Sequence, residues 1–209
     1  MSRRNRLPRR FYTRDDTLVI ARELLGQRLV VPNREGQRVS GRIVETEAYV
    51  GPEDRASHAF GNRRTARTEA MFGRGGIAYV YFIYGMYFQF NVVTGRESAP
   101  HAVLVRALEP VEGIEVMRAR RPVKDERNLT AGPGKLCIAM GIDLRLNRAD
   151  LLGPSVWIEK DLSIAAADVA SGPRIGIDYA QEFAAKPWRF WIRDNPYVSK
   201  MSGRVARKA

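Results

Sequence analysis

The chain has 209 residues, of which 44% are hydrophobic, and its 35 Lys and Arg against 23 Asp and Glu give a net charge of +12. This length and hydrophobic content suit one packed domain and exclude a chain that is disordered throughout. The positive charge, with a pI near 10.3, favours a polyanionic partner: nucleic acid first, an anionic membrane surface second.

Cysteine and histidine are scarce. The single Cys137 excludes an intramolecular disulfide, which fits a reducing cytosol, and its apolar surroundings predict a small buried hydrophobe. His58 and His101 are the only histidines, so a dedicated zinc site is not expected. No apolar run is long enough to cross a bilayer, and the basic start lacks the hydrophobic segment of a signal peptide. We therefore expect a cytoplasmic protein without a membrane partner.

Residues 1–10 are predicted to form a flexible basic arm, and residues 11–209 a single domain. The first helix is predicted over residues 18–26, because Asp15 and Asp16 suit the positive N-terminal end of a helix.

The remaining elements alternate between strands and short helices. Strands are predicted at 28–31, 39–50, 102–110, 155–160 and 187–194, and helices at 113–121 and 132–142. Residues 51–76 have little apolar periodicity and form a long loop, and such loops in compact domains tend to be functional. The predicted fold is one α/β domain with a mixed or mainly antiparallel sheet.

The stretch at 79–91 holds seven aromatic residues among thirteen. On a strand, Tyr79 and Tyr81 would share one face. Gly85 interrupts the run, so we predict two strands joined by a turn at 84–86.

Large apolar side chains flank the glycine of this turn. Tight turns usually carry small polar residues, but here Tyr84 and Met86 stand beside Gly85. Rings at a protruding tip suggest a wedge of the kind that unstacks bases from the minor groove. Composition alone favours the alternative, a pair of core strands that carries many rings.

Two carboxylates and a ring share one face of the strand at 39–50, since Glu45, Glu47 and Tyr49 alternate along it. Burial of an ionised carboxylate is costly unless the group is paired or functional. The face is therefore a solvated outer face, an ion pair with Arg42 or Arg106, or a site in which one Glu acts as general base beside a stacking ring. The pattern does not choose between Glu45 and Glu47.

His58 lies in the long loop, close in sequence to Arg63, Arg64 and Arg67. A lone loop histidine usually has no special role. Beside these arginines it is also a candidate for a pocket whose rim carries phosphate anchors.

Six stretches of the chain, in order, resemble the 3-methyladenine DNA glycosylase family of the alkyladenine (methylpurine) type. They read RIVETEAYVGPEDRASHAF, TARTEAMF, YVYFIYGMYFQFNVV, VLVRALEP, GPGKLC and WRFWIRDNPYVS. The resemblance covers about residues 10–203 and implies one domain with a curved, mainly antiparallel sheet and a protruding β-hairpin. It also implies a monofunctional base-excision repair enzyme with no metal and no cofactor.

Such an enzyme flips a damaged purine out of double-stranded DNA and hydrolyses its N-glycosidic bond, leaving an abasic site. We expect a monomer, because one flipped nucleotide needs one domain, and nucleoid association if the host is a bacterium.

The resemblance assigns roles residue by residue. Glu47 falls on the glutamate that activates water, and Arg106 on an arginine near it. Residues that match the base pocket are Tyr49, His58, Tyr81 and Asn91, the last of which discriminates against guanine. Tyr84 matches the side chain that intercalates into DNA, with Met86 beside it. The predicted phosphate contacts are Arg63, Arg64, Thr65, Arg67 and Lys135.

Three features depart from the family pattern. The loop expected at 92–105 is longer than in some relatives, Thr68 stands where Asn is expected, and the segment before 132–137 is compact. The length at 92–105 and the threonine at position 68 affect the expected DNA contacts and the selectivity of the pocket. They do not affect the expected hydrolysis of the N-glycosidic bond.

The residues themselves also allow two other classes. A non-catalytic basic nucleic-acid-binding module would share the charge and the rings, but it would not need Glu47 beside a polyanion. A base-modifying hydrolase such as a deaminase would need a zinc-binding Cys/His set that the sequence lacks.

Overall fold

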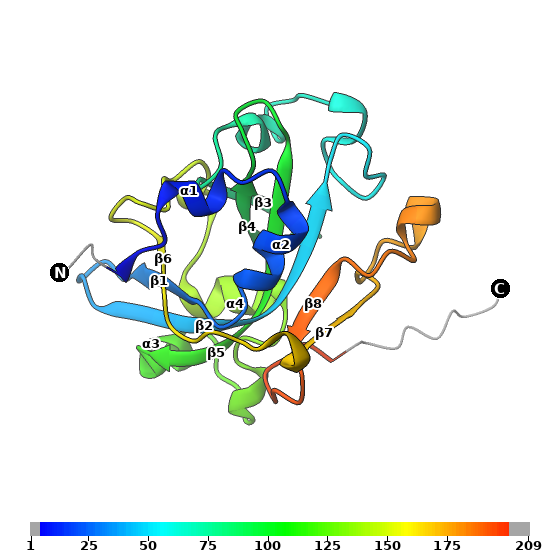
Figure 1. The fold of residues 1–209 in the computed structure, drawn as a ribbon. Helices are drawn as coiled ribbons and strands as arrows, with labels where there is room; N and C mark the ends of the chain where they lie inside the picture. Colours follow the sequence, from blue (N-terminus) through cyan, green and yellow to red (C-terminus); the bar gives the residue numbers. More distant parts are fainter. Residues whose placement is uncertain (1–4, 201–209) are drawn as a thin grey trace.

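The computed structural model describes residues 5–200 as a mixed α/β domain built on one eight-stranded antiparallel sheet (Figure 1). The sheet order is β3-β4-β5-β2-β1-β6, and β8 pairs with both β2 and β7. The strands are β1 (Arg28–Pro32), β2 (Arg38–Val50), β3 (Ala78–Ile83), β4 (Tyr87–Thr94), β5 (His101–Glu112), β6 (Trp157–Glu159), β7 (Val169–Gly172) and β8 (Arg189–Ile192). The predicted fold class is confirmed.

Short helices cover the sheet and fill its connections. The α-helices are α1 (Arg9–Tyr12), α2 (Thr17–Glu23), α3 (Ile114–Arg120) and α4 (Pro133–Met140). The 3₁₀ helices include η2 (Phe60–Asn62), η3 (Glu69–Phe72), η4 (Glu126–Asn128), η5 (Leu144–Leu146), η6 (Ala166–Asp168) and η7 (Asp178–Phe183). None of the helices within residues 5–200 is long and apolar enough to cross a membrane.

The start of the described chain is packed against the sheet. The Leu7 side chain is buried, and its N–H donates to the Ile158 carbonyl of β6 at 2.8 Å. The Arg9 guanidinium pairs with Asp150 at 2.6 Å. Residues 5–10 are therefore not the free arm that was predicted, and residues 1–4 lie outside the described part of the chain.

Both predicted helices that flank the core form where expected. The α2 helix begins at Asp16, whose Oδ1 accepts the Val19 N–H at 3.0 Å and so satisfies one free donor of the first turn. In α4, Pro133 occupies the first turn, where its missing N–H costs nothing. The helix ends at Gly141, whose φ of 72° is the left-handed conformation that favours glycine.

The main core lies between the sheet and these two helices. Ile20 of α2 and Leu136 of α4 are fully buried in one cluster with Phe90 of β4 and Phe190 of β8. Cys137 belongs to the same cluster, and burial raises the pKa of its thiol. The prediction of a small buried hydrophobe at Cys137 is confirmed.

The long strand β2 organises the centre of the sheet. It pairs with β5 from Ser40 to Val50, while β1 and then β8 pair along its other edge. The β2–β5 register shifts three times, because the pairing skips Val111 of β5, then Val44 of β2 and then Arg106 of β5. Such bulges bend a strand and redirect side chains, and the last two lie beside Glu45.

The segment at 92–105 is not the long loop that was expected. Strand β4 runs to Thr94 and β5 begins at His101, so only residues 95–100 connect them. The predicted long loop at 51–76 is correct, with η2 and η3 as its only helical turns.

Candidate active site

The carboxylates of Glu45 and Glu47 lie side by side inside the protein, with neither side chain exposed. Arg106 of β5 bridges them: its Nε donates to Glu45 Oε1 at 3.1 Å, and its Nη1 lies 3.2 Å from Glu47 Oε1. The solvated-face reading is therefore wrong. Of the two arginines considered, Arg106 pairs with the carboxylates, while Arg42 pairs with Glu109 and Asp161.

The partners of the Glu45 carboxylate connect elements of the fold. Arg189 Nε lies 3.0 Å from its Oε1, and the Ser199 N–H donates to its Oε2 at 2.9 Å. With Arg106, these groups join β2, β5, β8 and the end of the described chain around one buried charge. Neither Glu45 nor Glu47 is itself among the lining residues of the pocket described below, and the donors to Glu45 other than Arg106 are absent from its walls as well.

Glu47 receives its hydrogen bonds from the pocket side. The Ile175 N–H donates to its Oε1 at 2.8 Å, and the Tyr49 hydroxyl donates to its Oε2 at 2.8 Å. A carboxylate can accept about four hydrogen bonds, and Glu47 receives two, from Ile175 and Tyr49, in addition to its ion pair with Arg106. Oε2 therefore keeps an acceptor position for a further donor such as water.

The charges in this cluster support one another. Burial alone would lower the pKa of the Arg106 guanidinium, but the Glu47 and Glu45 carboxylates raise it, and the net direction is upward. Burial, followed by the charge of Glu47, raises the pKa of Tyr49 well above its usual value. Tyr49 thus stays protonated and acts as the donor to Glu47.

A cavity of about 150 Å³ opens above this cluster. Its lining residues, which come from the sheet, the long loop and the segment after β7, include Tyr49, His58, Tyr79, Tyr81, Tyr84, Asn91, Arg106, Ile175 and Tyr179. The structure thus brings together all four predicted base-pocket residues. Two larger hollows, of about 720 and 960 Å³, lie elsewhere and contain none of the predicted catalytic or base-pocket residues.

Three rings form one wall of the cavity. The His58 ring meets Tyr81 edge-on with centroids 4.6 Å apart, and Tyr79 lies 5.2 Å from Tyr81. His58 Nδ1 and the Tyr79 hydroxyl are hydrogen-bonded at 2.9 Å. Asn91 is held by its Nδ2, which donates to the Tyr79 carbonyl at 3.1 Å. The Tyr81 hydroxyl donates to Gln89.

These rings are electrically neutral. Burial, with a smaller effect from the nearby Arg67 charge, lowers the pKa of His58 to about 4. Burial raises the pKa of Tyr79 to about 12 and raises that of Tyr81 further. At neutral pH the wall therefore presents an uncharged imidazole and two phenols.

The hairpin tip stands out from the protein. The Tyr84 residue is 78% exposed and Met86 is 63% exposed. Tyr84 and Gly85 have φ of 54° and 67°, and the Met86 N–H donates to the Ile83 carbonyl at 3.3 Å. Two successive positive φ angles are typical of the tight type I′ turn, a conformation that is rare for tyrosine. Two strands joined by a turn at 84–86, as predicted, are confirmed.

The predicted phosphate contacts lie in two places. Arg64 is held by a bidentate pair with Glu69 at 2.7 and 2.9 Å, and the Arg67 guanidinium lies 4.9 Å above the Tyr81 ring centroid. Thr65 donates its N–H to the buried Thr68 hydroxyl at 2.8 Å, so Thr68 shapes this turn. Lys135 lies apart from them, in α4.

Several site residues were not predicted. Tyr79 was noted only as a strand neighbour of Tyr81, although it completes the ring wall. Ile175 acts through its backbone N–H, which leaves no signature in a sequence. Tyr179, which is 69% exposed at the cavity mouth in η7, and the buried Asp54–Arg174 pair lie in irregular segments. Within residues 5–200 no three His, Cys, Asp or Glu side chains are grouped so that they could hold a metal ion.

The fold and the cavity define a basic α/β protein with an aromatic pocket over a buried carboxylate, beside an exposed tyrosine on a hairpin. The family model for methylpurine-DNA glycosylase (MPG) matches residues 10–196. The chain belongs to this family of DNA repair enzymes, and the resemblance seen in its sequence is confirmed.

Curated relatives agree along nearly the whole chain. Three that bear the provisional name 3-methyladenine DNA glycosylase come from Desulfitobacterium hafniense, Bacillus cereus (strain G9842) and Chlamydia abortus. The first is 48% identical and the other two 50%. The matches cover 93%, 92% and 89% of this chain and 98%, 98% and 97% of the relatives.

Proposed function

We propose that this protein rotates a damaged purine out of duplex DNA into the aromatic cavity and hydrolyses its N-glycosidic bond with a water activated by Glu47. The observation that carries the proposal is the buried Glu47 carboxylate, whose two hydrogen-bond donors, Tyr49 and Ile175, both line the cavity. The substrate class rests on the family and on the names of the relatives.

Glu47 orients the water and accepts its proton as the water oxygen bonds to C1′ of the deoxyribose. The bond from C1′ to the base nitrogen breaks, and its electron pair leaves with the base. A purine alkylated on the ring is cationic, so this electron pair neutralises it and the base leaves readily. The Glu47 charge also stabilises the positive charge that develops on the sugar.

Arg106 holds Glu47 in place for this step. Its guanidinium lies 3.2 Å from Glu47 and is itself fixed by Glu45.

The neutral rings suit a flipped, positively charged base. Tyr49, Tyr81 and the uncharged His58 offer electron-rich faces, and a desolvated cation gains about 2 kcal/mol from such a face. A protonated His58 would instead repel the base. Asn91, held by the Tyr79 carbonyl, would crowd an amino group at purine C2 and so disfavour guanine.

The hairpin and the basic side chains would manage the DNA itself. Rotation of a nucleotide from the stack costs a few kcal/mol, less at damaged or mispaired positions. Tyr84, with Met86 beside it, would fill the gap and slow return of the base. Arg63, Arg64, Thr65, Arg67 and Lys135 would contact phosphates and fix the position of the duplex.

Product analysis tests this function. Duplexes with one hypoxanthine or one ethenoadenine, and methylated DNA, are incubated with the protein and then treated with hot alkali. We expect free base and alkali-labile abasic sites, without strand cleavage before alkali and without covalent trapping by borohydride. Trapping would contradict the hydrolytic mechanism. Absence of abasic sites on all three substrates would contradict the proposed function.

A further inference from the structure

Asp54–Arg174 is the only ion pair of the described chain in which both side chains are completely inaccessible to solvent, and it contacts the cavity wall at Tyr49. Arg174 Nη1 and Nη2 donate to the two oxygens of Asp54 at 2.5 and 2.8 Å. Asp54 also accepts the N–H groups of Val50 and Ala56, at 3.1 and 3.0 Å. The pair thus ties the end of β2 to the segment that follows β7.

Arg174 is in contact with both groups that donate to Glu47. Its guanidinium lies 4.7 Å from the Tyr49 ring centroid, and Nη1 also donates to the Ala48 carbonyl at 2.9 Å. The next residue along the chain is Ile175, whose N–H donates to Glu47. One guanidinium therefore fixes the tyrosine and the backbone amide that hold the two oxygens of this carboxylate.

Few main-chain hydrogen bonds fix the backbone there, and the nearest packing anchor is Ile177, which is buried in one cluster with Ala56 and Ala180. Strand β7 ends at Gly172, and Gly176 has a φ of 78° with open space around its Cα. No backbone–backbone hydrogen bond holds the N–H groups of residues 174–177 within the described chain, and Pro173 has no N–H to donate. Without the ion pair, the Ile175 N–H would lose its orientation.

Stability alone does not explain a pair of this kind. Desolvation of two buried charges offsets most of their attraction, and well-packed apolar residues often do as well. One hydrogen-bond donor of the pair is also left unused, because Arg174 Nε is buried without a hydrogen-bond partner among the described residues.

We infer that Asp54 and Arg174 form a positioning clamp for the Glu47 carboxylate, an inference that rests on the proposed function. The clamp does not touch substrate: Arg174 is fully buried behind Tyr49 and acts through Tyr49 and Ile175. Its loss affects the chemical step more than the binding of DNA, because the ring wall and the hairpin tip do not depend on it.

The test uses Asp54→Asn, which removes one charge, and Arg174→Lys, which keeps the charge but loses the bidentate geometry. Should Asp54→Asn fail to fold, Arg174→Lys carries the test. The matched control is Arg38→Lys, which breaks another bidentate pair, with Glu159 at 2.9 and 3.1 Å, outside the cavity walls. For each folded variant we would measure the single-turnover excision rate against pH, the Kd for lesion DNA, and hydrogen exchange of the Ile175 amide.

The expected result is an excision rate about 100-fold lower, as for a displacement of about 1 Å at a reacting group, with Kd within about threefold of wild type. The acid limb of the rate profile should move to higher pH, because a carboxylate that loses an N–H donor is protonated more easily. The Ile175 amide should exchange faster, and the control should match wild type in all three readouts.

An unchanged excision rate, or a lower rate with an unmoved acid limb and an unchanged Ile175 amide, would overturn the clamp. If wild type is active and Glu47→Gln is not, such a result rejects the clamp alone and leaves the proposed function standing. If wild type makes no abasic site, the function fails, and exchange of the Ile175 amide still decides whether the pair holds this backbone.

Discussion

At the scale of single residues, the protonation state of His58 links the pocket to the stability of the fold. Burial and Arg67 lower the pKa of His58 to about 4, against an ordinary value near 6.5. The folded state therefore binds a proton less readily than the unfolded chain. The stability that neutral His58 contributes is complete above pH 6.5 and is lost as the pH falls towards 4.

We therefore expect the free energy of unfolding to fall between pH 7 and pH 5 by about 1–2 kcal/mol more in wild type than in His58→Gln. Denaturant unfolding of both proteins at the two pH values measures this difference. Protons taken up elsewhere, for example at the partly buried His101, cancel in the comparison. Equal losses in the two proteins would mean that His58 is not held neutral by its surroundings.

Side chains that alternate on strands could be predicted, whereas backbone donors could not. Glu45, Glu47 and Tyr49 were expected on one face because strand residues alternate with a period of two, and they do lie together. The alternation did not choose between the two carboxylates, and only the family resemblance pointed to Glu47. In the structure this carboxylate accepts the backbone N–H of Ile175, which lies in an irregular segment 128 positions away in the chain. No local pattern of residues reveals such a partner.

At the scale of elements, the strands of the β3–β4 hairpin contribute to the fold, whereas its exposed tip does not. Its paired strands belong to the sheet, but Tyr84 at the tip is 78% exposed and lines the cavity mouth. Removal of its ring should therefore leave the fold intact.

We expect Tyr84→Ala to unfold at the same temperature as wild type, while its affinity for lesion DNA falls about tenfold, which corresponds to about 1.4 kcal/mol of lost base stacking. Tyr84→Phe, which keeps the ring, should bind like wild type. Fluorescence anisotropy with a lesion duplex and thermal unfolding measure the two quantities. Full affinity in Tyr84→Ala would remove the hairpin tip from the DNA contacts.

Predicted elements were most reliable where a strand had a periodic pattern and a clear turn. The strand predicted at 39–50 and the helix at 132–142 correspond to β2 and α4. The bulge at Arg106 depends on pairing with a distant strand, so it could not be predicted. The edge strand β7 has only four residues and no alternation of apolar residues.

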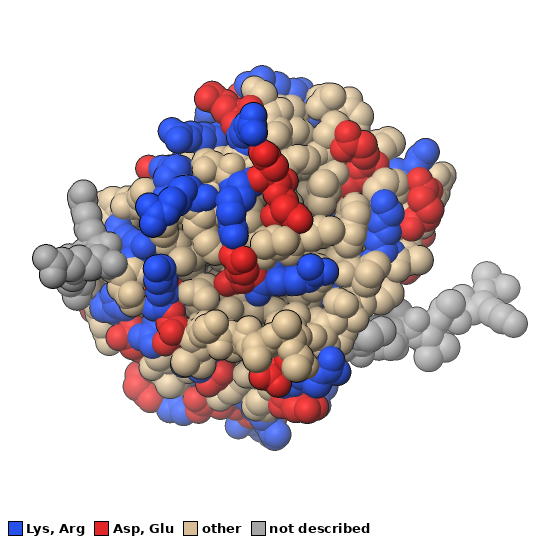
Figure 2. Space-filling view, viewed as in Figure 1, with Lys and Arg blue, Asp and Glu red and all other residues tan. Residues whose placement is uncertain are grey.

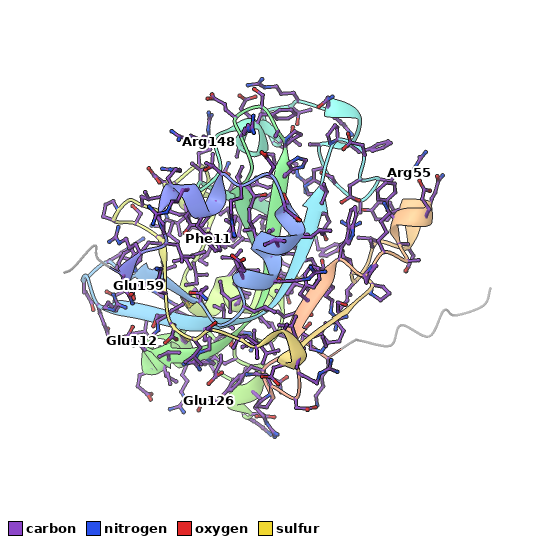
Figure 3. All side chains as sticks on the ribbon, viewed as in Figure 1. Phe11, Arg55, Glu112, Glu126, Arg148 and Glu159 are labelled. Atoms are coloured by element: carbon purple, nitrogen blue, oxygen red, sulfur yellow. The ribbon has the colours of Figure 1, made fainter. Side chains whose placement is uncertain are left out.

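At the scale of the whole molecule, Lys and Arg outnumber Asp and Glu, but basic and acidic side chains are interspersed on part of the surface. Figure 2 shows Lys and Arg side by side with Asp and Glu over the face that it presents. Many arginines are paired, such as Arg127 with Asp125 at 3.0 Å in η4. In Figure 3, Glu126 of this η4 turn lies at the opposite end of the molecule from Arg55 of the long loop, which pairs with Glu182 of η7.

The logarithm of the binding constant for DNA should fall linearly with the logarithm of the salt concentration. The slope is set by the number of phosphates that the protein contacts. No hydrogen bond or ion pair of the Arg63 side chain is found within residues 5–200. We expect Arg63→Ala to reduce this slope by about 1 and to weaken binding to damaged and undamaged DNA alike.

Arg127→Ala, at the other end of the molecule, should leave the slope unchanged. Titrations at several salt concentrations measure it. If Arg127→Ala reduced the slope as much as Arg63→Ala does, the DNA would not be confined to the side of the long loop.

The central claim is that Glu47 is the general base, and the most direct test is single-turnover excision by Glu47→Gln alongside its affinity for lesion DNA. A glutamine keeps the shape but cannot accept the proton. We predict a rate lower by about 100-fold or more, with Kd equal or tighter because a negative charge beside DNA is removed. A surface control, Glu109→Gln, should retain full activity. An excision rate within about tenfold of wild type would contradict Glu47 as the base.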